Sequence, residues 1–203
     1  MLIKTYPVGM LQENCYIVIN EKNNEAVMVD PGDDSNILVM ALMDLGCTLK
    51  AILLTHGHAD HVGAVASLKE KYNVPVYINS KEIECMERDN TVFGNIPDGN
   101  EFIKDGDIMH LAGMEIKCIN TPGHTPGGMC FLIGNELFTG DTLFQGSVGR
   151  SDFYGGNHTQ LINSINEKLM VLDKKIKVYP GHGPSSTLAY EGMRNPFLQD
   201  DLF

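Results

Sequence analysis

The sequence predicts an α+β fold in which two mixed β-sheets pack against each other, with helices on the outside. Strand-like apolar runs outnumber helix-like segments. Helices separate only some of these runs, which does not fit a simple alternating array of parallel strands and helices. With 203 residues, of which 43% are hydrophobic and 20% charged, the chain is large enough to bury a substantial core. We expect one domain over residues 1–203.

The N-terminal half contains four strand-like apolar runs. They are Cys15–Ile19, Ala26–Val29, Lys50–Leu54 and Val74–Ile78. Helical patterns alternate with these runs, and the predicted helices are Ser35–Leu45, His61–Lys71 and Ser80–Arg88. Ser35 is expected to cap the first helix and Gly46 to stop it. The stretch 89–99 is rich in Asn, Gly, Pro and Asp and is predicted to be the longest loop.

The C-terminal half continues this pattern with five strand-like runs. They are Asp107–Leu111, Met114–Ile119, Met129–Ile133, Glu136–Thr139 and Lys175–Tyr179. One long helix is predicted over Thr159–Leu172, before the last strand. The tail, residues 185–203, is expected to hold one short helix.

Charge and hydropathy exclude two classes of partner. Acidic side chains outnumber basic ones by 26 to 15, giving a formal net charge of −11. Nucleic-acid-binding proteins hold phosphates with clustered Lys and Arg, and this chain has no such run. No apolar run reaches the ~20 residues that a membrane span needs, and Met1–Asn20 does not resemble a signal peptide. We therefore expect a cytoplasmic protein that acts on a small molecule, without a nucleic-acid or membrane partner; the oligomeric state is left open.

The cysteines do not suggest a disulfide framework or a structural zinc site. There are five, an odd number, and they are widely scattered and never arranged as CxxC. This pattern is typical of reduced thiols in a core. The residues are Cys15, Cys47, Cys85, Cys118 and Cys130.

The histidines are concentrated in three short segments. Of the seven, three lie in THGHADH (Thr55–His61), one in TPGHTPGG (His124) and one in YPGHGP (His182). Each segment follows a strand-like run and is flanked by Gly or Pro, so we expect a loop at the C-terminal end of a strand, where ligands of α/β sheets gather. His110 and His158 lie outside the pattern and are interpreted as ordinary surface or core residues.

The spacing within THGHADH predicts two neighbouring metal sites. In an extended backbone His56 and His58 lie on the same side and can bind one ion. The adjacent Asp60 and His61 must point in different directions, so they can bind a second ion beside the first. Imidazole and carboxylate ligands without a thiolate suit zinc, iron or manganese.

Asp141 and two further histidines would complete these sites. Asp141, in FTGDTLF, ends another strand-like run and can bridge two ions because a carboxylate offers two oxygens. His124 and His182 would add one ligand to each set. Ordinary alternatives exist, since Asp60 can be a helix cap and Asp141 a turn residue. Five histidines and two aspartates in four glycine-punctuated loops favour the metal site.

Taken together, THGHADH, TPGHTPGG, FTGDTLF and YPGHGP resemble the metallo-β-lactamase superfamily, and in particular its glyoxalase II-like branch of hydroxyacylglutathione hydrolases. The resemblance runs from Cys15 to about Pro196 and implies an αβ/βα sandwich. It implies that the first metal is bound by His56, His58, His124 and Asp141. It implies that the second is bound by Asp60, His61, Asp141 and His182. Asp30, in MVDPG, matches an aspartate that supports the metal loop, although it can also be a turn residue.

Two departures from glyoxalase II leave the thiol carrier open. The glyoxalase II enzymes have a C-terminal helical domain that binds glutathione, and we expect no such domain in this chain. A family tyrosine after the last metal histidine is replaced by Gly183-Pro184. The segment GSVGRSDFYGG nevertheless resembles the glutathione-binding loop, with Arg150 at the position of its lysine and Tyr154 standing for its tyrosine. Arg150 is either a substrate ligand or a structural ion-pair residue.

The predicted chemistry is hydrolysis of a thioester or ester such as S-lactoylglutathione, with Asp60 and Asp141 in the catalytic centre. Two cations ~3.5–4 Å apart lower the pKa of a shared water to around 7, which supplies the nucleophile. A leaving thiolate has a conjugate-acid pKa of ~8.5 and departs without a general acid. The predicted cofactors are two divalent ions, zinc first and iron or manganese as alternatives.

Several alternative functions are kept. A lactonase uses the same ligands. A persulfide dioxygenase has a segment similar to GRSDF (Gly149–Phe153) but uses one iron and oxidises its substrate. A β-lactamase would need export, or a thiolate ligand that this chain does not offer near Asp141. A non-catalytic metal-binding module would not require a bridged site with seven ligands.

Overall fold

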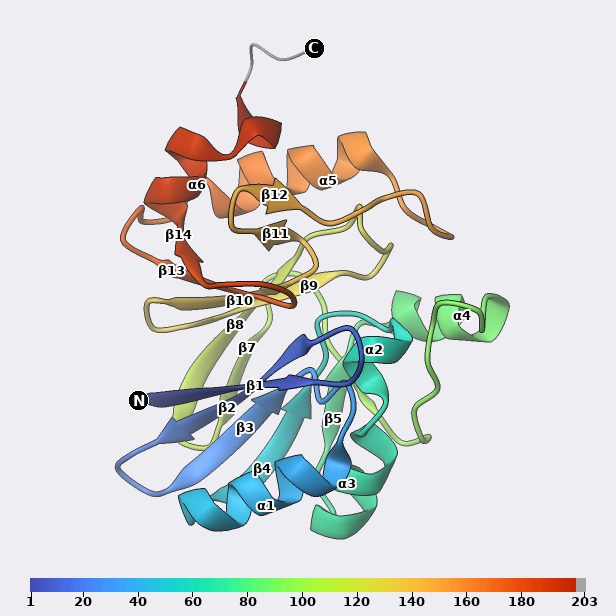
Figure 1. Cartoon of the computed structure of the whole chain (residues 1–203), viewed down its shortest axis with the longest axis vertical. Coiled ribbons are helices and arrows are strands. Elements are labelled where there is room, and N and C mark those ends of the chain that lie inside the picture. The colour runs from blue at the N-terminus through green and yellow to red at the C-terminus, as the bar shows by residue number, and fades with distance from the viewer. Residues whose placement is uncertain (200–203) are drawn as a thin grey trace.

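The computed structural model of the protein describes residues 1–199, so residues 200–203 of the predicted tail lie outside the described part of the chain. Two six-stranded β-sheets face each other, and helices cover the outer face of each (Figure 1). The layers therefore run helix, sheet, sheet, helix. This arrangement confirms the predicted α+β fold and the αβ/βα sandwich.

The first sheet comes from the N-terminal half of the chain. Its strands, in spatial order, are β1 (Leu2–Val8), β2 (Glu13–Asn20), β3 (Glu25–Val29), β4 (Thr48–Leu53), β5 (Val76–Ile78) and β6 (Glu101–Phe102). Strands β1 to β3 are antiparallel, whereas β3 to β6 run parallel. Parallel neighbours need crossover connections. Helices supply these connections: α1 (Ser35–Leu45) before β4, α2 (Ala59–Val62) and α3 (Val65–Tyr72) before β5, and α4 (Ser80–Arg88) before β6.

The second sheet comes from the C-terminal half. Its strands, in spatial order, are β14 (Ser186–Thr187), β13 (Lys177–Pro180), β10 (Glu136–Gly140), β9 (Met129–Ile133), β8 (Met114–Asn120) and β7 (Ile108–Leu111). Only β10 and β13 are parallel, and the crossover between them contains α5 (His158–Ser164) and a π-helical turn, Ile165–Leu169. A small hairpin of β11 (Leu143–Phe144) and β12 (Ser147–Val148) precedes α5. The chain continues after β14 with α6 (Leu188–Arg194) and a 3-10 turn, Pro196–Leu198.

The two sheets share an apolar core. Along β2, Tyr16 and Val18 point between the sheets and pack with Phe131 and Phe138 of the second sheet. Ile17, which lies between them in sequence, points to the opposite face and packs under α1 and α3. Each of these side chains is at most 3% exposed, and burying one contributes ~1.5–3 kcal/mol. Every helix within residues 1–199 is too short or too polar to cross a lipid bilayer.

The clearest difference from the sequence prediction concerns the helix expected over His61–Lys71. Helical structure begins earlier, at Ala59, stops at Val62 and resumes at Val65. The backbone N–H of Ala64 donates to the carbonyl of Pro31 at 3.0 Å, so it is not available to continue the helix. A contact with a distant loop therefore divides one predicted helix into two.

Smaller differences have local causes. The helix predicted over Thr159–Leu172 starts at His158, becomes π-helical and ends at Leu169. Ser35 begins α1 but does not cap it, because the capping position is Asp34, in a left-handed conformation without a side-chain cap. Strands β6, β11, β12 and β14 were not predicted, since two residues are too few to show an alternating pattern. The seven-residue β1 was not predicted either, because only Val8 of its residues is buried and it shows no apolar run. All five cysteines are free, and four of them are buried.

Candidate metal centre

The histidine-rich segments meet at one end of the sandwich, where four strands end. The loop Thr55–His61 follows β4 of the first sheet. His124, Asp141 and His182 follow β8, β10 and β13 of the second sheet. Both sheets therefore contribute residues to one site.

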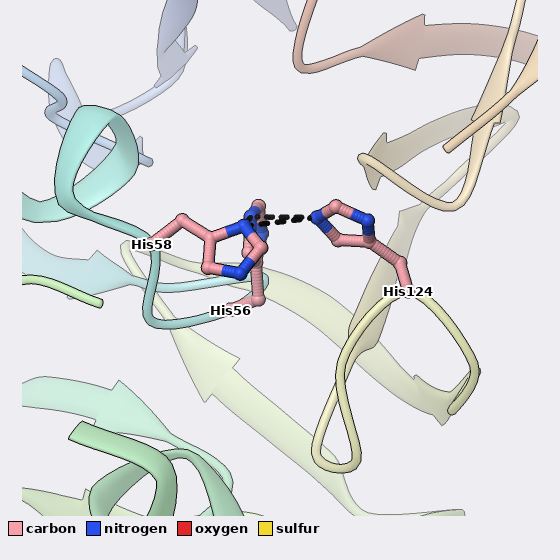
Figure 2. Close-up of side chains that lie close together, drawn as sticks. All are labelled: His56, His58 and His124. Carbon is pink, nitrogen blue, oxygen red and sulfur yellow. Dashed lines mark hydrogen bonds between the residues drawn. The ribbon is translucent and has the colours of Figure 1, made fainter. Parts of the chain in front are cut away.

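His56, His58 and His124 form a compact cluster of three imidazoles, which we call the three-histidine cluster (Figure 2). His56 Nε2 lies 3.1 Å from His58 Nδ1. His124 Nε2 lies 3.3 Å from His56 Nε2 and 3.0 Å from His58 Nδ1. In tetrahedral zinc sites with Zn–N distances of 2.0–2.1 Å, ligand nitrogens are about 3.3–3.4 Å apart. The observed separations are close to that spacing.

The hydrogen bonds on the far side of the rings assign the tautomers of two of these histidines. His124 Nδ1 lies 2.6 Å from the backbone carbonyl of Arg150, which can only accept a hydrogen bond. Thr55 Oγ1 donates to Asp30 Oδ2 at 2.5 Å, so it accepts from His56 Nδ1 at 3.0 Å. In both rings Nε2 therefore carries a lone pair and no hydrogen. Two such atoms facing each other repel unless a cation lies between them, so the cluster fits a metal ion.

Burial keeps these imidazoles neutral, which is the form that binds metals. The three rings are at most 4% exposed. Burial lowers the pKa of His56 well below its ordinary range and that of His58 to about 3, and the neighbouring histidines add to the effect. Burial also lowers the pKa of His124. The cluster thus offers neutral nitrogen donors at physiological pH.

Asp60, His61 and His182 form a second group beside the first, and we call it the aspartate–histidine group. His182 Nε2 lies 3.3 Å from Asp60 Oδ2, and His61 Nε2 lies 3.9 Å from the same oxygen. Burial lowers the pKa of His182, but the hydrogen bond to Asp60 and the charge of Asp141 outweigh it and raise that pKa. Asp60 and His182 are 27% and 28% exposed. This group is therefore more charged and more open to solvent.

Asp141 lies between the two groups. Its Oδ1 is 3.4 Å from His61 Nε2, and its Oδ2 is 3.6 Å from His124 Nε2. Burial raises the pKa of Asp141, but the charges of His61 and His182 outweigh it and lower that pKa well below the usual range. Oδ1 of Asp141 and Nε2 of His61 are buried without a hydrogen-bond partner in the described chain. Buried polar atoms normally have partners, so these two also fit an ion.

Asp30 supports both groups from behind. Its Oδ1 accepts from the backbone N–H of Thr55 at 2.7 Å, and its Oδ2 accepts from Thr55 Oγ1 and from His61 Nδ1 at 3.0 Å. Both oxygens are engaged, so Asp30 orients His56 and His61 rather than facing the space between the groups. Its backbone is left-handed, with φ of 49°, an uncommon conformation that tends to occur where the structure needs it.

Two buried glutamates near the site were not found by sequence reasoning. Glu82 of α4 accepts from the backbone N–H of Gly57 at 2.8 Å and from that of Gly127 at 2.7 Å. It therefore links the loop of His56 and His58 to the loop of His124. Burial raises the pKa of Glu82 to about 7. Glu13, fully buried, has its Oε1 3.8 Å from His61 Nδ1. Glutamate is usually exposed, so neither position carries a sequence signal.

A cavity of about 510 Å³ opens in front of both groups. Apart from the clustered residues, it is lined by Leu11, Ala59, Thr91, Val92, Arg150 and Phe153. The rings of Phe93 and Phe153 pack edge-on against His58, with centroids 4.7 and 5.7 Å away. The cavity thus has the histidines and aspartates on one side and partly apolar side chains around them.

Of the two predicted substrate ligands, Arg150 lines this cavity and Tyr154 does not. The Arg150 guanidinium makes two hydrogen bonds to Asp152, at 2.7 and 2.8 Å, and lies 3.7 Å above the ring of Phe153. Tyr154 accepts a hydrogen bond from Arg88 at 3.2 Å. Their role in substrate binding stays a prediction. The two histidines outside the pattern lie elsewhere, with exposed His110 on β7 and His158 at the start of α5.

Comparison with known proteins agrees with this geometry. The chain matches the sequence model of the metallo-beta-lactamase superfamily over residues 8–182, which include all four loops of the site. It is 38% identical to the hydroxyacylglutathione hydrolase GloC of Haemophilus influenzae, over 98% of each chain. It is 33% identical to the probable metallo-hydrolase YqgX of Bacillus subtilis, over 95% of each chain.

Solved structures give the same result. The BLEG-1 B3 metallo-beta-lactamase matches with a TM-score of 0.90 and 34% identity, over 97% of this chain and 99% of that one. TTHA1623 in a di-iron-bound form matches with a TM-score of 0.84 and 36% identity, over 96% of this chain and 100% of that one. ETHE1 from Myxococcus xanthus matches with a TM-score of 0.85 and 27% identity, over 97% of this chain and 84% of that one. On the sequence match, the shared sandwich and the clustered histidines and aspartates, the chain belongs to the metallo-beta-lactamase superfamily of metal-binding hydrolases.

Proposed function

We propose that this protein is a hydrolase that cleaves a small anionic thioester or ester, such as S-lactoylglutathione, with two divalent metal ions. The observation that carries the proposal is the position of Asp141, whose two oxygens face His61 and His124 separately. A carboxylate placed between two donor groups suits a pair of ions. The 38% identity to a hydroxyacylglutathione hydrolase over nearly the whole chain supports the choice of substrate.

The residues divide into two ligand sets. The three-histidine cluster and Asp141 would hold one ion, and the aspartate–histidine group with Asp141 would hold the other. Bound divalent ions polarise a carbonyl group and lower the pKa of water to about 7. Asp60, at the cavity surface, supplies a carboxylate oxygen that can accept a proton from the attacking water. Asp30 and Thr55 keep His56 and His61 oriented throughout.

The cavity walls favour a thioester over an amide. Outside the two ligand sets, the described lining residues are apolar side chains, Thr91 and Arg150. Thr91 already donates its hydroxyl hydrogen to Asp89, and an arginine does not release its proton at neutral pH. The leaving group must then depart unaided or with the one proton that Asp60 has accepted. A thiolate, with a conjugate-acid pKa of ~8.5, can depart unaided, whereas an amine needs that proton.

We propose zinc as the metal, with iron or manganese as alternatives, because imidazole and carboxylate ligands accommodate all three. The similarity to TTHA1623 in a di-iron-bound form supports an iron alternative. We also infer that the two sheets act as one domain, since they share one apolar core.

The test is metal analysis of the purified protein followed by an anaerobic substrate panel. We expect close to two transition-metal ions per chain, and cleavage of S-lactoylglutathione that exceeds cleavage of lactones and of β-lactams. Saturation with a single ion would contradict the dinuclear part. Faster cleavage of a lactone than of every thioester would replace the thioesterase with a lactonase.

A persulfide dioxygenase is the second candidate, because the segment Gly149–Phe153 resembles that family and ETHE1 is a structural neighbour. An oxygen-electrode trace with glutathione persulfide, beside the anaerobic thioester assay, separates the two. We expect thioester cleavage without oxygen. Oxygen uptake by iron-loaded protein with no anaerobic cleavage would establish the second candidate instead.

A further inference from the structure

A second hollow lies next to the metal-site cavity, between α4 and two of the site loops. It has a volume of about 430 Å³, and we call it the α4 pocket. Lys81 and Arg88 of α4 form one wall, and Pro126 and Tyr154 form the opposite one. Apart from Tyr154, a predicted substrate ligand, these residues have no role in the proposed hydrolysis.

The α4 pocket and the metal-site cavity are neighbours at three places along the chain. Tyr154 lines the α4 pocket, and the preceding Phe153 lines the cavity. Pro126 lines the pocket and His124, two residues earlier, lines the cavity. Arg88 lines the pocket and Thr91, three residues later, lines the cavity. The two hollows therefore lie on neighbouring stretches of the same three chain segments.

The charges of the α4 pocket suit an anion. Lys81 and Arg88 are exposed and form no ion pair within residues 1–199, whereas Arg150 at the neighbouring rim is already paired with Asp152. One carboxylate, that of Glu84, also lines the pocket, so the cations are in excess there. This local excess stands out in a chain with a net charge of −11.

Tyr154 fixes the direction of the arginine. Arg88 Nη1 donates to the Tyr154 hydroxyl at 3.2 Å. A phenol oxygen that accepts in this way keeps its own hydrogen for another acceptor. The remaining N–H groups of a guanidinium form a planar fork that matches the two oxygens of a carboxylate. Arginine and tyrosine together thus present several donors to one anionic group.

We propose that the α4 pocket binds a carboxylate of the thiol carrier while the thioester lies at the metal centre. Arg88 is the main ligand, and Lys81, about two helical turns earlier, adds positive charge to the same wall. This inference rests on the proposed function and names its substrate class: a thioester of an extended, carboxylate-bearing thiol. A thioester of a short thiol without such a carboxylate would occupy only the metal-site cavity. A phosphate-bearing thiol would bring a second negative charge close to Glu84, so a carboxylate is the better match.

The test compares Arg88→Gln with the wild type on two lactoyl thioesters, one of glutathione and one of the uncharged thiol N-acetylcysteamine. Losing a charge-assisted contact should raise KM for the glutathione thioester by about 10- to 150-fold, with kcat and bound metal unchanged. KM for the uncharged thioester should not change. Glu84→Gln should act in the opposite direction and lower KM for the charged substrate only.

The control is Arg194→Gln. Arg194 is also exposed and also ends a helix, α6, so it shares the favourable interaction of a cation with a helix C-terminus. If Arg88 served only to stabilise α4, both variants would lower the melting temperature alike and neither would change KM. Equal rises in KM for the charged and uncharged thioesters would also overturn the proposal.

A binding measurement keeps this proposal separate from the proposed function. S-methylglutathione, which has no free thiol for a metal, is titrated calorimetrically into metal-loaded wild type and Arg88→Gln, with coenzyme A as the phosphate-bearing comparison. We expect the wild type to bind S-methylglutathione more tightly than the variant does, and more tightly than it binds coenzyme A. Failure of all thioester cleavage, with this difference intact, would reject the hydrolase but keep the pocket. Thioester cleavage without any Arg88-dependent binding of S-methylglutathione would reject the pocket but keep the hydrolase.

Discussion

The three-histidine cluster and the aspartate–histidine group lie side by side but are built in opposite ways. In the first, His56, His58 and His124 are buried and neutral, and hydrogen bonds to Thr55 and to the backbone of Arg150 leave two ring nitrogens bare. In the second, His182 and Asp60 are partly exposed and already pair with each other. The three-histidine cluster therefore has free lone pairs for a cation, whereas the charges of the aspartate–histidine group already balance each other in part.

This difference teaches that the two ions should not be equivalent. The imidazoles of the three-histidine cluster have lowered pKa values, so a cation entering there competes little with protons. A cation entering the aspartate–histidine group must compete with the contact between His182 and Asp60, and the raised pKa of His182 adds competition from protons. We expect the first ion to bind more tightly and the second to be lost first.

The largest effect is expected from Asp141→Ala, because this carboxylate faces both groups. The variant should lose affinity at both sites and fall to less than one ion per chain, with kcat/KM for the thioester reduced by more than about 100-fold. Elemental analysis and steady-state kinetics check this, with the exposed His110→Ala as the matched control. Retention of two ions by Asp141→Ala would show that the groups are independent.

Removing one ligand from each group should separate the two ions. Titration of the wild type with a chelator should release the ions in two steps. His182→Ala should lack the easily released ion and keep the other, whereas His124→Ala should lose the tightly held one. The measurement is bound metal against free chelator concentration. If His182→Ala instead lost the tightly held ion, the order inferred from burial and charge would be reversed.

A smaller, indirect effect is expected from Glu82→Gln. An amide cannot accept hydrogen bonds at both of its ends, so one of the bonds to Gly57 and Gly127 is lost. Supporting contacts of this kind affect metal affinity by about 10- to 100-fold. We expect weaker binding at the three-histidine cluster and an altered visible spectrum of the cobalt-substituted protein. Glu84→Gln, on the exposed face of the same helix, should change neither.

The smallest effect is expected from Arg150→Gln. His124 is held by the backbone carbonyl of Arg150 and not by its side chain, which pairs with Asp152 at the surface. Exposed substitutions usually change stability by less than about 0.5 kcal/mol, so metal affinity should stay within about twofold. Chelator titration measures it. A large loss would mean that the Arg150–Asp152 pair, and not the backbone alone, positions His124.

The sequence was most informative where function depends on short segments. THGHADH has four of the clustered residues within seven positions, and apolar runs ahead of each loop indicated that the loops end strands. The sequence did not indicate Glu82, because that side chain becomes buried only when α4 meets two loops that are far apart in the chain. The pairing of Arg88 with Tyr154, 66 positions apart, has the same origin.

The fold shows the same division between local and distant causes. Strands with buried apolar runs, and the longer helices, were predicted from their own residues. The mostly exposed β1 and the strands of two residues were missed, because they depend on pairing with a neighbour. The break between α2 and α3 depends on the Pro31 carbonyl, which no pattern within residues 61–71 could reveal.

The division of the cluster between the two sheets has a consequence for turnover of the protein itself. His56 and His58 follow a strand of the first sheet, and His124 follows a strand of the second. An ion held by all three would act as a removable cross-link between the layers, and only the folded chain offers that site. A ligand at 1,000 times its dissociation constant adds about 4.1 kcal/mol to the free energy of unfolding. Resistance to proteases should therefore follow the metal supply, so that a metal-starved cell degrades the chains it cannot load.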